Sequence, residues 1–277
     1  MDVKSRPHAS DSNLLEQRKQ EEIKFHNRKR LFTHGTAEHE QHYPGVKYYS
    51  VNRGVHKYIA EWLSARCAGK RALVYGCGDG GQSFFLARNG ASSVIGIDIA
   101  DESIKLAREQ AENEGLSSRI SFQVMDCENL AFADSSVDII VAAAVLHHLD
   151  LPRAYPEMAR VLTPSGSIIC VEPLAHNPLI QLYRRRTPDQ RTPWEIEHIL
   201  RMKDVRLANK FFDRVEVRFF NLFTLLAVPF RNSSGFPKIL AAMEAVDSVA
   251  LRIPILRYQA WQVAFVLSKP RKTNTLQ

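Results

Sequence analysis

The sequence predicts an α/β fold in which a mainly parallel sheet carries helices on both faces. Two observations lead to this class. Between residues 71 and 172, short apolar runs alternate with helical patterns, as they do in β–α units. The runs are apolar at almost every position, which is typical of strands that are buried on both faces of a sheet.

The strands are predicted from apolar runs that end at glycine, aspartate or proline. Ala72-Leu73-Val74-Tyr75 stops at glycines, and similar runs recur along the chain. We therefore expect strands over residues 72–75, 93–98, 120–124, 137–141 and 167–171. Residues 212–220 alternate apolar and charged side chains, as a half-exposed strand does, and residues 261–267 are expected to form the last strand.

The helices are predicted from apolar spacings of three and four residues and from capping residues. Val55, Ile59 and Trp62 fall on one helical face, and Asp101 and Asp150 are expected N-caps. We expect helices over residues 51–65, 83–88, 101–115 and 150–161, and partly helical structure over residues 222–258.

The composition bounds the class of protein. Of the 277 residues, 45% are hydrophobic and 24% charged, so the chain can bury a sizeable core and is not disordered throughout. The formal net charge of +7 is not gathered in one long run, so nucleic acid or an anionic membrane is permitted as a partner without being required.

The cysteines and the apolar segments indicate a cytoplasmic protein. Cys67, Cys77, Cys127 and Cys170 form no CxxC pair, which fits a reducing compartment. Residues 1–20 contain no apolar signal-peptide core, and the nine apolar residues 222–230 are too few to span a bilayer. We expect no transmembrane segment.

The first strand runs directly into a loop that precedes a helix and reads Gly76-Cys77-Gly78-Asp79-Gly80-Gly81. Glycines let the backbone turn sharply and approach a ligand, and the helix start offers free N–H groups to an anion. The spacing fits both a dinucleotide loop, GxGxxG, and the GxGxG loop of nucleoside-binding methyltransferases. The loop alone leaves both ligands open.

Two aspartates follow the next two strands. Asp98 lies at the distance from the loop where both kinds of protein place an acid for ribose hydroxyls, and Asp126 directly follows the third strand. Either could be an ordinary turn or capping residue. A carboxylate after a buried strand nevertheless points to the crevice where α/β proteins bind ligands.

The order of several signals along the chain separates the dinucleotide-binding reading from the methyltransferase reading. These signals are the glycine loop, Asp98, Asp126, and the segments Val-Leu-His-His-Leu (145–149) and Arg-Val-Leu-Thr-Pro-Ser-Gly (160–166). Over about residues 70–173 the chain resembles the class I S-adenosylmethionine-dependent methyltransferases, close to the methyltransferase domain 11 subgroup. The resemblance implies a Rossmann-like seven-stranded mixed sheet in the order 3-2-1-4-5-7-6, with strand seven antiparallel.

The resemblance also implies S-adenosyl-L-methionine as the cofactor. Gly76, Gly78 and Gly80 would lie under its methionine part and ribose, Asp98 would take the ribose hydroxyls and Asp126 the adenine amino group. Ile99 would pack on adenine. Three further residues complete the expected cofactor site: Cys77, Cys127 and Tyr49.

The same resemblance suggests a domain plan. A polar extension over residues 1–45, a tail or loosely attached helix, is expected to be partly disordered. Residues 46–277 would form one methyltransferase domain, with the cofactor core at 70–173 and the substrate-side insertions and last two strands at 174–268. Tyr48 and Tyr49, ahead of the core, would be lid residues.

One position departs from the family pattern. The family usually has Asp or Glu two residues before the first glycine, where it contacts the methionine end of the cofactor. Here that position is Val74. The departure raises the alternative of a protein that binds the cofactor without turning it over.

Methyl transfer from a sulfonium requires donor and acceptor to be held together, and a base is optional. His147, after the fourth strand, is the candidate base, and Glu172, at the end of the fifth, is a candidate substrate contact or loop anchor. We expect no metal site, because His147 and His148 are adjacent and no third ligand lies at suitable spacing.

The acceptor is expected to meet segments outside the common core. Residues 219–230 could form an apolar wall, and Arg184-Arg185-Arg186 could bind an anionic group. Core packing and a solvated helix face are the alternatives. The wall and the basic surface together permit peripheral membrane contact.

The sequence therefore predicts a methyltransferase with a small-molecule acceptor, lipid-like or polyketide-like, and no nucleic acid as a partner. The methylated atom and the oligomeric state stay open. A non-catalytic partner protein, a nicotinamide-dependent oxidoreductase and an RNA or protein methyltransferase are the alternatives. No Tyr-x-x-x-Lys pair follows the fourth strand to support an oxidoreductase.

Overall fold

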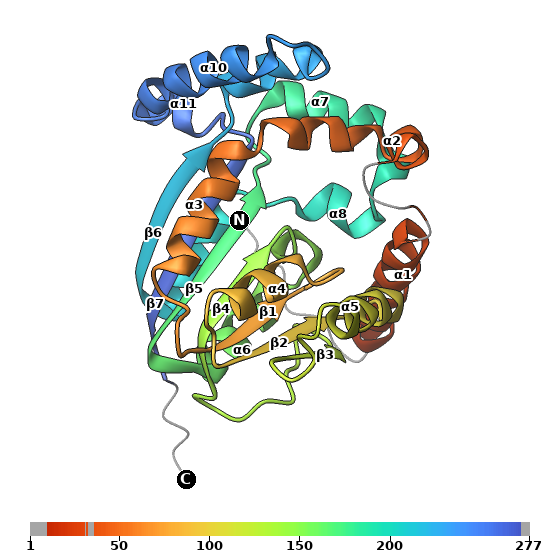
Figure 1. Ribbon diagram of the computed structural model, residues 1–277, viewed down its shortest axis with the longest axis vertical. Helices are drawn as coiled ribbons and strands as arrows, with labels where there is room; N and C mark the ends of the chain where they lie inside the picture. The colour runs from red at the N-terminus through yellow and green to blue at the C-terminus, as the bar shows by residue number, and fades with distance from the viewer. Residues whose placement is uncertain (1–9, 31, 33–35, 273–277) are drawn as a thin grey trace.

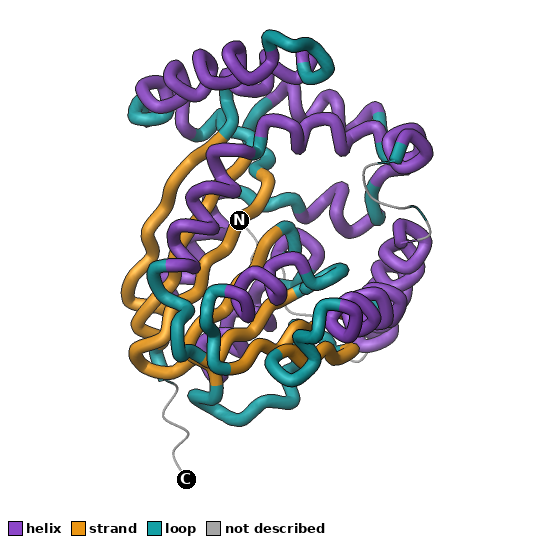
Figure 2. Tube along the Cα trace, in the orientation of Figure 1, coloured by secondary structure: helices purple, strands orange, loops and turns teal. Residues whose placement is uncertain are grey.

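The strands form one twisted mixed sheet (Figures 1 and 2). The computed structural model describes residues 10–30, 32 and 36–272. Among them the strand order is β3-β2-β1-β4-β5-β7-β6, and β7 runs antiparallel to both of its neighbours, as predicted. The strands are β1 (Arg71–Tyr75), β2 (Ser93–Asp98), β3 (Ile120–Val124), β4 (Val137–Ala143), β5 (Leu162–Pro173), β6 (Phe212–Phe220) and β7 (Gln262–Pro270).

The apolar runs form strands because both faces of the sheet are covered. In β1, Leu73 and Tyr75 enter one core cluster, while Ala72 and Val74 enter the other. This alternation follows from the two-residue period of a strand. The cluster of Val74 also holds side chains from α3 (Arg53–Ser64), α4 (Gly81–Arg88) and α5 (Asp101–Asn113). The opposite cluster holds side chains from α6 (Leu151–Val161) and α9 (Met202–Leu207).

Further elements lie around the carboxyl ends of the central strands. They are α2 (Ala37–His42), the 3₁₀ helices Pro44–Val51, Leu146–His148 and Phe223–Phe230, and the helices α7 (Pro178–Arg186), α8 (Pro193–His198), α10 (Phe236–Ala250) and α11 (Pro254–Arg257). The expectation of partly helical structure over residues 222–258 is confirmed. No described helix is both long and apolar enough to cross a bilayer.

One capping prediction was wrong by one residue. Asp101 is the first residue of α5, and Ala100 is the N-cap. The Asp98 carboxylate accepts the Ala100 N–H at 2.9 Å. Asp98, at the end of β2, thus satisfies a backbone N–H at the start of α5, as a capping side chain would. Asp150 does occupy the N-cap position of α6.

Helix α1 (Ser10–Arg30) packs beside α5, and charged groups attach it to the sheet domain (Figure 1). Arg18 Nη2 donates to the Glu128 carboxylate at 2.6 Å, and both side chains are buried. The same Glu128 oxygen accepts the Asp150 N–H at 2.8 Å. The helix is thus held by a buried ion pair that is tied to the sheet domain through backbone.

Removing one partner of this pair should loosen α1. In Arg18→Met the buried Glu128 carboxylate loses its closest cation and keeps only the longer contacts with Lys19 and Arg153, which costs about 3 kcal/mol. Amide hydrogen exchange across α1 should therefore accelerate by on the order of 100-fold. Arg28→Ala removes the same charge from an exposed position of the helix and is the matched control. Equal exchange rates in the two variants would contradict a role for the Arg18–Glu128 pair.

Candidate active site

The glycine loop after β1 needs glycine for conformation and for space. Gly76, Gly78 and Gly80 have φ values of 56°, 55° and 95°, which side chains disfavour. A Cβ on Gly76 would lie 2.5 Å from Val145 Cγ2, and one on Gly80 would lie 2.8 Å from Phe84. The loop therefore packs tightly against the segment after β4 and leads directly into α4.

Asp98, at the end of β2, fixes this loop. Its Oδ2 accepts the Gly78 N–H at 2.9 Å, and its Oδ1 accepts the Ala100 N–H at the same distance. The carboxylate thus sits between the glycine loop and the start of α5. Ile99, beside it, is half-buried.

Cys77, Asp126 and Cys127 lie just beyond the carboxyl ends of β1 and β3. Asp126 Oδ1 accepts the Glu128 N–H at 2.8 Å, and Oδ2 pairs with Lys19 of α1. Cys77 and Cys127 are buried, and burial raises the pKa of both thiols, so they stay neutral and serve as packing groups. Helix α1 therefore covers the edge where the sequence predicts adenine.

His147 is held by Glu172. Its Nδ1 lies 2.6 Å from Glu172 Oε2, while Glu172 Oε1 accepts the N–H groups of Val145 and Leu146 at 2.9 and 2.8 Å. Glu172 is 0% exposed, so it lies behind His147 and anchors the loop. The carboxylate fixes the proton on Nδ1 and leaves Nε2 as the imidazole acceptor.

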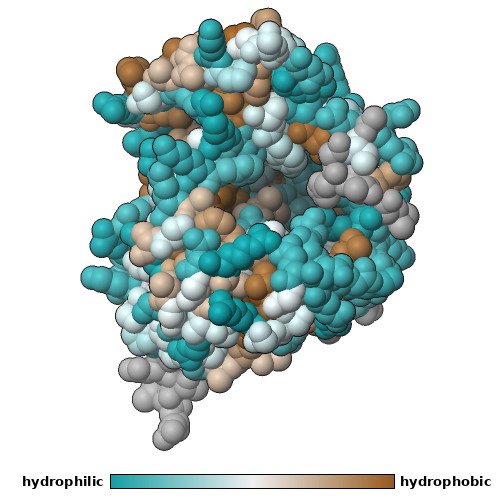
Figure 3. All heavy atoms as spheres, in the orientation of Figure 1, coloured by the Kyte–Doolittle hydropathy of each residue, from teal (hydrophilic) through white to brown (hydrophobic). Residues whose placement is uncertain are grey.

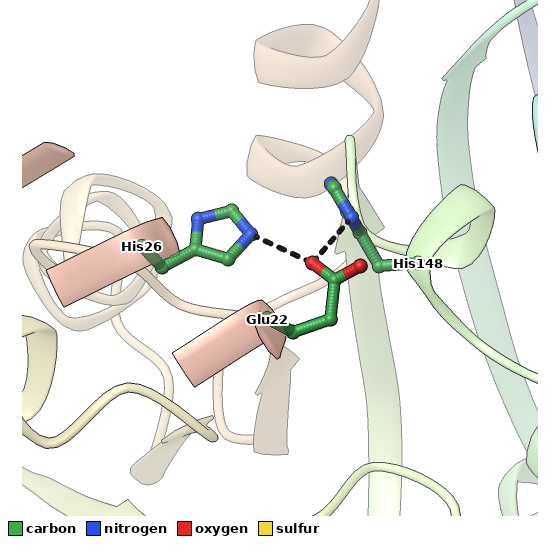
Figure 4. Close-up of side chains that lie close together, drawn as sticks. All are labelled: Glu22, His26 and His148. Carbon is green, nitrogen blue, oxygen red and sulfur yellow. Dashed lines mark ion pairs between the residues drawn. The ribbon is translucent and has the colours of Figure 1, made fainter. Parts of the chain in front are cut away.

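A second histidine cluster lies alongside (Figure 4). Glu22 and His26 stand one turn apart on α1 and face His148 from the 3₁₀ helix after β4. Glu22 Oε2 lies 3.0 Å from His148 Nδ1 and 3.5 Å from His26 Nε2. Burial lowers the pKa of His26, which favours the neutral imidazole at neutral pH.

Glu195 of α8 lies close to several basic side chains. Its carboxylate lies 3.0 Å from Arg184, 3.6 Å from Arg191 and 4.0 Å from His147 Nε2. Burial favours protonation of Glu195, but the electrostatic effect of the neighbouring histidines and of Arg184 outweighs this and lowers its pKa. Of the three consecutive arginines, only Arg184 turns inward, because Arg185 and Arg186 are exposed.

A cavity of about 810 Å³ opens between these groups, and Figure 3 shows a hollow with apolar side chains inside it. Its floor is the end of β4 and β5, with Ala143, Ala144 and Val171. The apolar wall comes from Leu222, Phe223, Leu225 and Leu226, and the aromatic wall from Tyr48, Tyr49, Tyr183 and Trp261. Tyr49 stacks on Trp261 with ring centroids 5.9 Å apart.

The structure thus separates the predicted residues into two neighbouring groups. The glycine loop, Asp98 and Asp126 lie along β1, β2 and β3. His147, Tyr48, Tyr49, Arg184 and part of the 219–230 segment line the cavity. Phe219 and Phe220 are not in its lining: Phe219 packs against one core cluster and Phe220 belongs to the other. The Gly76–Val145 contact joins the two groups.

Sequence reasoning missed six residues that the structure brings to the site: Lys19, Glu22, His26, Lys29, Arg191 and Glu195. Four of them lie on α1. The available signal was the recurrence of polar residues every three or four positions, which marks one helical face.

A methyltransferase domain model matches residues 73–170 of the chain. Methyltransferase GfsG of Streptomyces halstedii is 37% identical over 36% of this chain and 37% of its own length. Phosphoethanolamine N-methyltransferase 3 of Arabidopsis thaliana is 31% identical over 43% of this chain and 25% of its own length. The chain thus spans about a quarter to a third of the length of these curated relatives.

In three-dimensional structure, the similarity to solved methyltransferases extends over most of the chain. Geranyl diphosphate C-methyltransferase from Streptomyces coelicolor A3(2), solved with Mg²⁺, geranyl diphosphate and S-adenosyl-L-homocysteine, superposes with a TM-score of 0.61 at 15% identity. The superposition covers 91% of this chain and 98% of that one. Together with the strand order, these matches show that residues 73–170 form a methyltransferase domain and that the chain has the fold of the class I S-adenosylmethionine-dependent methyltransferases.

Proposed function

We propose that the chain transfers the methyl group of S-adenosyl-L-methionine to a small, largely apolar acceptor that carries one anionic group. The observation that carries this proposal is the cavity of about 810 Å³ at the ends of β4 and β5. It lies close to the glycine loop, because Ala144 lines it and the next residue, Val145, packs against Gly76. A donor on the loop and an acceptor in the cavity would therefore be neighbours, which is the main requirement of methyl transfer.

On the donor side, we assign Gly76, Gly78 and Gly80 to the methionine part and ribose, and Asp98 to the ribose hydroxyls. Asp98 suits this role because it already fixes the loop. Asp126, with Ile99, Cys77 and Cys127 around it, would bind adenine. Asp126 now pairs with Lys19, so the adenine amino group would meet a carboxylate that α1 also contacts.

On the acceptor side, apolar and cationic groups line the same cavity. The apolar and aromatic walls fit a hydrocarbon body. Lys29, Arg184 and Arg191 also line the cavity and fit an anionic group. Among the similar proteins, two are named for the phosphate-bearing acceptors phosphoethanolamine and geranyl diphosphate, and others are named for the apolar acceptors sterol and demethylmenaquinone.

His147 is the proposed base. With its Nδ1 proton donated to Glu172, the lone pair of Nε2 is available to a proton of the acceptor. Glu172 is then a positioning residue. The cofactor supplies the electrophilic methyl group when it is bound.

The buried Val74 supports a second candidate function, a protein that binds the cofactor without turnover. Its side chain is 2% exposed and packs in an apolar core cluster, where the family pattern has an acid.

All four cysteines are free, which supports the proposal that the protein acts in the cytoplasm.

An acceptor panel tests the proposal directly. With methyl-labelled S-adenosylmethionine, an isoprenoid or fatty acid with a phosphate or carboxylate should be labelled faster than its neutral alcohol. A phenol, a small polar amine and transfer RNA complete the panel. Labelling confined to RNA or to small polar amines would refute the acceptor class, and cofactor binding without labelling of any acceptor would favour the second candidate function.

Asp98→Asn should weaken cofactor binding by on the order of 10-fold or more, because a charge-assisted hydrogen bond is worth about 1.5–3 kcal/mol. Titration calorimetry with S-adenosylhomocysteine measures the effect. Asp101→Asn, three residues away on the exposed start of α5, is the control and should bind normally. The assignment fails if the two variants bind equally well.

Glu172→Gln should lower turnover by about 100-fold, because it no longer fixes the proton on His147 Nδ1. Cofactor affinity should stay within about threefold, since binding and chemistry are separable. Glu157→Gln is a control, because Glu157 also accepts a backbone N–H, that of Leu130, but is not part of the cavity wall. A parallel loss of cofactor affinity and turnover in Glu172→Gln would instead indicate a packing role alone.

A further inference from the structure

The Glu22–His26–His148 cluster has the composition of a metal site (Figure 4). One ligand atom from each residue lies within 4.8 Å of the others. The separations of 3.0 and 3.5 Å from Glu22 Oε2 to the two imidazole nitrogens bracket the value of about 3.3 Å for ligands that share one tetrahedral zinc ion.

The contacts of Glu22 with the two histidines are ion pairs of poor hydrogen-bond geometry. Glu22 Oε2 and His148 Nδ1 are both buried, and neither makes a hydrogen bond of acceptable geometry. Two buried polar atoms that face one another in poor hydrogen-bond geometry gain less than a well-formed hydrogen bond would give. A cation between them would satisfy both at once.

The surrounding shell orients the ligands. The Thr192 hydroxyl binds the other oxygen of Glu22, and it also accepts the Glu195 N–H at 3.1 Å at the start of α8. The backbone of α8 therefore supports the carboxylate through Thr192. Metal-binding carboxylates are commonly held in this way by a second polar group.

We propose that Glu22, His26 and His148 bind a divalent transition metal ion such as Zn²⁺, with an open position toward the acceptor cavity. His26 and His148 both line that cavity. Two imidazoles and one carboxylate favour Zn²⁺, Co²⁺ or Mn²⁺ over Mg²⁺, which prefers oxygen ligands. Three protein ligands with a fourth position open are typical of zinc sites that bind a substrate.

The open coordination position of the metal ion restricts which acceptor molecules fit the cavity, and this step rests on the proposed function. Lys29, one turn beyond His26 on α1, lines the same cavity. A metal ion and an ammonium group on one wall would together bind an anionic oxygen, while the apolar walls hold the rest of the molecule. The acceptor would therefore carry its phosphate or carboxylate oxygen toward α1.

Metal binding can be measured without an acceptor. The full chain, dialysed against a chelator, is titrated with Zn²⁺ by calorimetry, and Co²⁺ is followed by its visible absorption. We expect one ion per chain with a Kd tighter than about 10 µM, and Mg²⁺ at least tenfold weaker. Intense visible Co²⁺ bands would indicate a four-coordinate site.

The variants Glu22→Gln and His26→Ala should each weaken Zn²⁺ binding by about 100-fold or more, since loss of a ligand costs at least as much as loss of its supporting partner. His56→Ala is the matched control, because His56 lines the same cavity from α3. Circular dichroism checks the fold of each variant. Should His26→Ala fail to fold, the nearly isosteric Glu22→Gln decides.

Two results would overturn the metal site. One is the absence of Zn²⁺ binding to the wild-type chain at 100 µM, a concentration about tenfold above the expected Kd. The other is that both ligand variants bind Zn²⁺ as tightly as His56→Ala does. Either result leaves methyl transfer to be judged by the acceptor panel. Conversely, a chain that binds one Zn²⁺ through these residues but labels no acceptor would keep the site and refute the proposed function.

Discussion

The buried carboxylate of Glu172 is the constraint on which the rest of the site depends. It lies at the end of β5 with no exposed surface, and it accepts two N–H groups from the segment after β4 as well as the contact from His147. A buried carboxyl group is tolerated there because each oxygen has a partner. The segment that it holds includes Val145, against which Gly76 packs. One side chain thus fixes the histidine, the cavity floor and the neighbour of the glycine loop.

Helix α1 completes the site through charge. Lys19 reaches Asp126, Arg18 reaches Glu128, and Glu22 and His26 reach His148. Successive turns of one helix therefore contact the edge of β3 and the wall of the acceptor cavity. Apolar burial contributes little here, since Phe25 is the one buried apolar side chain among the described side chains of α1. The position of α1 depends on buried ion pairs, whose geometry is specific because a misplaced charge would stay unpaired.

The sheet could be predicted from the sequence, whereas the role of α1 could not. Residues 72–75 are apolar at every position, and this local property identifies a strand buried on both faces. The polar face of α1 has a meaning only once Glu128, 110 residues away along the chain, is placed beside Arg18. The same limit applies to Arg184, Arg185 and Arg186, which are chemically alike and adjacent. The position of Glu195 in the fold, not the sequence pattern, selects Arg184.

Ion pairs between distant segments recur around the site. Carboxylates at the carboxyl ends of the strands and around the cavity are matched by cations from elsewhere in the chain, as in Arg18 with Glu128 and Arg184 with Glu195. The first pair is buried and the side chains of the second are each 11% exposed, so neither pair contributes an exposed charged patch. Lys29 and Arg191 then face the cavity, where burial lowers the pKa of both side chains. Cations held in a desolvated cavity gain most from an anionic ligand, because water no longer screens the attraction. Lys29 and Arg191 are therefore the cavity cations that best suit the anionic group of the proposed acceptor.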